Sequence, residues 1–124
     1  MLPFIFVDDL PSRDFAESFC VRVNPFIKDK DELFKAIYYM LWFPGYFGFN
    51  WDALYDCLRD FDWIPLNEIV VVHESLPGLP RNELKLYIEI LRDAVLDWGF
   101  DNKHTLKIFF KNNDRAAIEE ILKI

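Results

Sequence analysis

The sequence predicts an α/β fold in which helices flank a small parallel β-sheet of about three core strands, with a fourth strand if residues 1–18 add one. Two observations lead to this prediction. Short runs rich in β-branched residues alternate along the chain with longer segments whose apolar residues recur at helical spacing. Strands that are separated by helices pair in parallel through right-handed crossovers, so the helices pack against the sheet.

The first part of the chain supplies two candidate strands and a helix. Residues 2–7 form an apolar run, and residues 19–23 alternate apolar with polar side chains. We expect a helix from Asp29 to about residue 42, because its apolar residues recur three and four positions apart. Glu32 follows Asp29 at the spacing of a capping box, which marks the start of that helix.

An aromatic loop, residues 43–49, separates this helix from a second one. Proline and glycine within the loop break the helix and allow unusual backbone dihedrals. Asn50 is a suitable N-cap for a second helix that runs to about Asp60. The continuous apolar run in residues 68–73 is too short for a helix and predicts a buried strand at the centre of the sheet.

The second half of the chain continues the alternation. Residues 81–98 have the period of an amphipathic helix, and Gly99 is its expected end. Residues 105–110 then predict another strand. A last helix is expected within residues 113–124, capped by Asn113.

Length and composition predict one folded domain over residues 1–124. The chain is 52% hydrophobic and 18% aromatic, which excludes a disordered acidic tail and allows a packed core without disulfides or metals. Its formal net charge of -7 disfavours nucleic acid and anionic membranes as partners, because phosphate groups bind to clusters of Lys and Arg. A basic protein is the complementary partner.

Cysteine usage and the start of the chain predict a cytoplasmic protein. Cys20 and Cys57 have neither the spacing nor the density of a secreted disulfide scaffold, so reduced thiols are expected. Residues 1–9 are apolar at first but carry no positive charge before the first acidic residue. They resemble neither a secretory signal nor a membrane span.

Two acidic stripes follow from helical spacing. Asp52, Asp56 and Asp60 recur every four residues along the second helix, opposite its apolar side. The helix in residues 81–98 repeats the pattern with Glu89, Asp93 and Asp97. Like charges so arranged cost a few tenths of a kcal/mol per pair, roughly, which suggests that the stripes serve a partner. The alternative is that they are ordinary solvated faces of an acidic protein.

The aromatic loop is the second unusual feature. Six aromatic residues in and beside it cannot all be buried by one short connection: Trp42, Phe43, Tyr46, Phe47, Phe49 and Trp51. Two interpretations stay open at this point. Some of the rings are anchors for a protein partner, or the loop folds back onto the edge of the core.

Catalytic interpretations have little support. His73 and His104 lack metal-ligand spacing to a cysteine or carboxylate, Cys57 lies on the inward side of its helix, and no glycine-rich phosphate loop occurs. We therefore expect no enzyme activity, no catalytic residue, no cofactor and no metal. The remote alternative is an acidic hydrolase that uses two carboxylates as acid and base, as a glycosidase does. It has little support because the chain is short for a cleft that binds a saccharide.

Residues 44–58, PGYFGFNWDALYDCL, resemble the barstar signature PxYYGxNLDALWDCL. The order of the surrounding elements fits that family as well, and the resemblance covers about residues 19–110. Residues 1–18 and the helix within residues 113–124 lie outside it as an N-terminal extension and an additional C-terminal helix.

The resemblance implies a ribonuclease inhibitor, or an immunity protein against a ribonuclease toxin. Its expected partner is a cognate basic ribonuclease or RNase toxin domain, bound 1:1 by a chain that is monomeric when free. Asp56 and Asp52 match two helix aspartates that engage the nuclease's cations, with Asp56 in the place of substrate phosphate, and Tyr46 matches a tyrosine that covers the cleft. The expected partner-binding residues are Tyr46, Phe47, Phe49, Asn50, Trp51, Asp52, Tyr55, Asp56, Arg59, Asp93 and Asp97.

The sequence differs from the family pattern at several positions. These differences bear on which nuclease is bound more than on how it is bound. Phe49 stands at an often acidic position, Trp51 replaces a leucine, Tyr55 replaces a tryptophan, and Arg59 adds a positive charge at the edge of the acidic face. A nuclease other than barnase itself is expected. The runner-up hypothesis is a barstar-like scaffold whose aromatic loop serves an oligomer interface or another non-nuclease protein.

Overall fold

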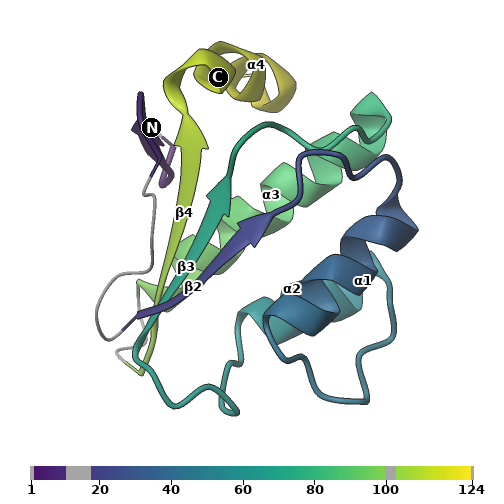
Figure 1. Cartoon of the computed structure of the whole chain (residues 1–124), viewed down its shortest axis with the longest axis vertical. Helices are drawn as coiled ribbons and strands as arrows, with labels where there is room; N and C mark the ends of the chain where they lie inside the picture. Colours follow the sequence, from purple (N-terminus) through teal and green to yellow (C-terminus); the bar gives the residue numbers. More distant parts are fainter. Residues whose placement is uncertain (1, 11–17, 100–102, 124) are drawn as a thin grey trace.

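The computed structural model describes residues 2–10, 18–99 and 103–123. They form a four-stranded parallel sheet with helices packed against it, and Figure 1 shows the arrangement. The strand order is β1-β4-β3-β2. The strands are β1 (Ile5–Val7), β2 (Ser18–Val23), β3 (Glu68–His73) and β4 (Thr105–Lys111). The helices are α1 (Lys30–Met40), α2 (Trp51–Leu58), α3 (Arg81–Trp98) and α4 (Arg115–Leu122), the last preceded by the short 3-10 turn η1 (Asn112–Asp114).

Strand β3 lies inside the sheet, where residues 69–72 form a continuous apolar run. Val71 aligns with Val21 of β2 on one side and with Ile108 of β4 on the other. A continuous apolar run suits a strand that is covered on both faces. The predicted α/β class is therefore confirmed, and β1 of the N-terminal extension supplies the fourth strand by pairing in parallel with β4.

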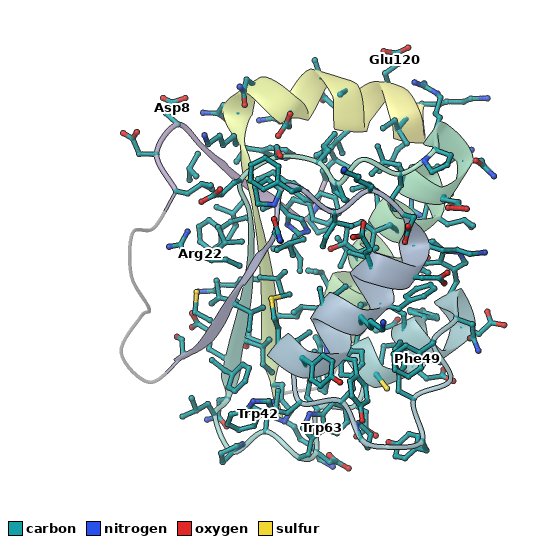
Figure 2. The ribbon with its side chains drawn as sticks, turned by 45° about the vertical axis from the view of Figure 1, so that its right-hand side comes forward. Asp8, Arg22, Trp42, Phe49, Trp63 and Glu120 are labelled. Carbon is teal, nitrogen blue, oxygen red and sulfur yellow. The ribbon has the colours of Figure 1, made fainter. Side chains whose placement is uncertain are left out.

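The helices α1, α2 and α3 cover one face of the sheet, while Arg22 lies on the opposite side in Figure 2. The main core fills the space between helices and sheet, with Phe34, Leu54 and Tyr87 almost completely buried. A smaller cluster around Val70 and Val72 occupies the other face. The main core fixes α2 against the rest of the molecule, which matters because α2 carries the sequence-predicted site.

Several element boundaries differ from those that the sequence predicts. Strand β1 starts at Ile5 instead of residue 2, and η1 delays the start of α4 to Arg115. Helix α1 ends at Met40, because Trp42 adopts a left-handed backbone with φ 56° that cannot continue a helix. Asp29 caps this helix as expected, accepting a hydrogen bond from the backbone N–H of Glu32 at 2.8 Å.

Both cysteines are thiols, as expected. Burial raises the pKa of the Cys57 thiol to about 11, so this side chain stays protonated and belongs to the core. Among the helices in the described ranges, none has the length and apolar character needed to cross a membrane.

Candidate protein-binding site

Asn50 sets the start of α2 and so the direction of the acidic face. Its side-chain oxygen accepts a hydrogen bond from the backbone N–H of Ala53 at 2.8 Å, and its amide nitrogen donates to the Gly48 carbonyl at 3.3 Å. Gly48 is tied to this arrangement, because a Cβ there would lie 2.9 Å from the Asn50 amide nitrogen. Asn50 is exposed, but its side chain works mainly as a helix cap.

Replacing Asn50 by alanine is expected to lower the free energy of unfolding by about 1 kcal/mol, within the usual range of roughly 0.5–2 for a lost N-cap. Chemical denaturation measures the change. Asn50→Asp keeps a capping oxygen and should restore most of the stability. If Asn50→Ala were as stable as the wild type, the cap would not hold α2 in place.

The aromatic residues of the loop separate into a buried and an exposed set. Phe43 and Phe47 are only 5% and 4% exposed, and their rings contact each other edge to face at 5.0 Å between centroids. Tyr46 and Phe49 are 71% and 44% exposed. The sequence predicts Phe47 at the partner surface, and this prediction is wrong. The Phe47 ring lies in the core beside Phe34 of α1 and supports the loop from inside. The loop therefore folds back onto the core through Phe43 and Phe47, while Tyr46 and Phe49 stay exposed to solvent.

Tyr46 is held over the end of α2 by Asp60. The tyrosine hydroxyl donates to Asp60 Oδ2 at 3.4 Å. Partial desolvation and the nearby Asp60 carboxylate raise the pKa of Tyr46, which favours the protonated hydroxyl that donates to Asp60. Asp60 was expected in the acidic stripe of the helix, but α2 ends at Leu58 and the following turn carries Asp60 toward the loop. Sequence spacing alone could not locate this partner of Tyr46.

A hydrogen bond joins α2 to the acidic side of α3. The Tyr55 hydroxyl donates to Asp97 Oδ2 at 2.8 Å, and this bond is the main reason why the pKa of Tyr55 is raised. Asp93 also contributes to that increase through its charge. Tyr55, which stands where the family has a tryptophan, therefore connects the acidic stripe of α2 with that of α3 at Asp97.

The two helix aspartates are open to solvent. Asp52 is exposed in the first turn of α2, and the Asp56 side chain is 72% exposed. Arg59 contacts Asp56 at 2.8 Å, so one cation already lies within the acidic surface. Asp93 forms a corresponding pair with Arg92 at 3.0 Å.

Six of the sequence-predicted residues define a surface on and around α2 that we call the acidic α2 face. They are Tyr46, Asp52, Tyr55, Asp56, Arg59 and Asp97. Phe49 borders it on the loop, labelled in Figure 2, with its ring 5.1 Å from that of Tyr38. Trp51 is half-buried and packs edge to face on Phe34 at 4.8 Å, so only part of its ring reaches the surface.

Both histidines lie in the buried interior of the described ranges. No group of three or more His, Cys, Asp or Glu in these ranges is arranged to hold a metal ion. His73 and His104 are both buried and bind backbone carbonyls, of Phe109 and Leu66 respectively. The described surface offers exposed carboxylates on α2 and exposed aromatic rings on the loop before it, which suits recognition of a basic protein surface.

Fold and surface together define a small parallel α/β protein with an acidic helix face. The family described as Barstar (barnase inhibitor) matches residues 19–111, well over half of the chain. The chain therefore belongs to the barstar family, whose members are ribonuclease inhibitors and not enzymes. Strand β1 and helix α4 lie outside the matched residues. No curated protein matches the chain.

Proposed function

We propose that this protein is a cytoplasmic inhibitor of a basic ribonuclease, or an immunity protein against a ribonuclease toxin, that occludes the active site with its acidic α2 face. The observation that carries the proposal is the exposed Asp56 carboxylate at the centre of a surface within the family match. A ribonuclease binds phosphate through cations, and those cations are receptors for carboxylates. Two thiol cysteines suit a reducing compartment.

The proposed binding mode gives each part of the surface a separate task. Asp56 enters the phosphate site, Asp52 pairs with cations beside it, and Tyr46 covers the cleft as a rigid aromatic anchor. Asp97 and Asp93 on α3 extend the negative surface. A ring such as Tyr46 adds contact area with little loss of side-chain entropy, while the carboxylates supply orientation.

The proposal is tested by co-expressing the chain with the product of the neighbouring reading frame, purifying through a tag on the chain, and measuring RNA cleavage. Barnase is assayed in parallel as a defined ribonuclease. We expect a 1:1 complex with one ribonuclease and loss of its RNA cleavage when the chain is present in equal amount. A ribonuclease that binds but continues to cleave RNA would exclude occlusion of its active site.

Association with that ribonuclease is expected to depend strongly on salt. The chain carries a formal net charge of -7, so long-range attraction to a basic partner raises the association rate constant. Screening over about 10 Å at 0.1 M salt removes most of that attraction. Stopped-flow measurements from low to high salt should show a marked fall in the association rate constant and a smaller change in dissociation. An association rate constant independent of salt would contradict electrostatic steering.

A second candidate function is self-association or binding of a non-nuclease protein, favoured by exposed rings outside the acidic α2 face. Tyr39 and Trp42 are 72% and 61% exposed. The Trp42 ring packs edge to face on Phe19 of β2, with 4.8 Å between the ring centroids. Sedimentation equilibrium of the wild type and of Trp42→Ala distinguishes the two functions. A dimer that Trp42→Ala dissociates would favour this second function.

A further inference from the structure

Arg59 is a cation placed inside a surface that otherwise presents negative charge. It follows α2 as the C-cap residue, and its guanidinium reaches back over the helix. One terminal nitrogen contacts Asp56 Oδ1 at 2.8 Å, and the other lies 3.7 Å from Asp97 Oδ2. The acidic α2 face therefore has a mixed charge pattern in which a positive group lies between carboxylates of α2 and α3.

The guanidinium is held on several sides at once. Its central carbon lies 3.8 Å from the centre of the Tyr55 ring, and its Nε donates to the Tyr55 carbonyl at 3.4 Å. Tyr55 is itself fixed by its hydrogen bond to Asp97. A planar guanidinium that stacks on a ring while its fork contacts carboxylates gives up all of these contacts if it swings away. Together these contacts favour the observed position of Arg59 between Asp56 and Asp97.

A fixed cation beside Asp56 limits which active sites can receive that carboxylate. The Asp56 side chain is 72% exposed although it contacts Arg59, so the carboxylate can still meet cations of a nuclease. Those cations would then come close to the guanidinium, and like charges brought together out of water repel strongly. The arrangement is favourable only if the partner places a negative group against Arg59.

We propose that Arg59 determines specificity by pairing with a carboxylate of the ribonuclease that lies next to its phosphate-binding cations. This inference rests on the proposed function and adds to it the kind of active site that the chain selects. A carboxylate at that place is chemically reasonable in a ribonuclease, since cleavage of RNA by its own 2′-hydroxyl requires a general base beside the phosphate. An active site of cations alone is rejected.

The test compares Arg59→Gln with Arg81→Gln, a control with the same change in charge. Arg81 belongs to the start of α3 and pairs with Glu120 of α4 at 3.6 Å, outside the acidic α2 face. Inhibition is measured on the ribonuclease recovered by co-purification or on barnase, whichever the wild type inhibits more tightly. We expect Arg59→Gln to weaken binding about tenfold or more relative to Arg81→Gln, and Arg59→Lys to recover only part of the loss.

A double-mutant cycle then identifies the partner group. Each carboxylate near the phosphate site of the ribonuclease is changed to its amide, and binding is measured directly by titration calorimetry because loss of the general base abolishes cleavage. One of these changes should make the loss from Arg59→Gln disappear. If Arg59→Gln binds as tightly as Arg81→Gln, or more tightly, the specificity role is wrong while an Asp56-dependent inhibition still supports the proposed function. If the wild type inhibits neither ribonuclease, both the specificity role and the proposed function are wrong.

Discussion

Replacing Asp56 by alanine is expected to remove inhibition without unfolding the protein. In the proposed complex Asp56 meets several cationic donors at once, and its removal leaves those donors buried without a partner. The expected loss is roughly 2–5 kcal/mol or more, a range that already includes measurements on the barnase–barstar complex itself. This corresponds to a decrease in affinity of about 30-fold to several thousand-fold. Titration of RNA cleavage with wild type and variant measures it.

The stability of the free protein should change much less. The Asp56 side chain is 72% exposed, and its contact with Arg59 is an exposed ion pair, a class worth about 0–1 kcal/mol. Glu89→Ala, on the far part of the α3 stripe, is the matched control and should cost little in affinity. If Asp56→Ala kept full inhibition, or lost it only together with its folded structure, the acidic α2 face would not be the inhibitory surface.

The fold could be predicted in detail because pattern and packing agree along most of the chain. The bounds of β3 and α3 match the predicted residues 68–73 and 81–98. A continuous β-branched run has one suitable place in an α/β protein, at the buried centre of the sheet. The ends of α1 and α2 were less predictable, because Trp42 and Phe61 adopt left-handed backbones that sequence spacing does not reveal.

The site could be located from the sequence, but its internal contacts could not. Helical spacing places Asp52 and Asp56 on one face, and the resemblance identifies that face. The contact of Arg59 with Asp97 depends on how closely α2 and α3 approach, which is a tertiary property. The burial of Phe47 beside the exposed Phe49 has a similar origin, because the loop backbone decides which ring faces the core.

The buried pair of His73 and Tyr87 is the other feature with a large expected effect, this time on stability. The Tyr87 hydroxyl lies 2.7 Å from His73 Nε2, and His73 Nδ1 lies 3.3 Å from the Phe109 carbonyl. A carbonyl can only accept, so His73 Nδ1 carries a proton and donates to Phe109, and in the neutral imidazole Nε2 accepts from the Tyr87 hydroxyl. Burial lowers the pKa of His73 to about 4, against the weaker opposing effect of the Phe109 carbonyl.

A mutation test follows from this hydrogen bond. Tyr87→Phe leaves Nε2 buried without a donor and is expected to lower the free energy of unfolding by about 1–3 kcal/mol. The double variant His73→Leu/Tyr87→Phe removes both polar partners and should recover part of that loss. Denaturation with urea at neutral pH measures both. Equal stability of wild type and Tyr87→Phe would show that the hydrogen bond contributes nothing.

Acid should destabilise the protein through the same histidine. The pKa of His73 is about 4 in the folded protein and 6.5 in the unfolded chain, so between these values the unfolded chain binds a proton that the folded protein does not. The free energy of unfolding therefore falls as the pH falls from 6.5 to 4, by roughly 3 kcal/mol in total, and this loss does not grow further below pH 4. The double variant His73→Leu/Tyr87→Phe lacks the histidine and retains every carboxylate. Its stability should fall less over this range, and the difference between the two urea-denaturation profiles isolates His73. Parallel profiles would mean that the imidazole is protonated in the fold without cost.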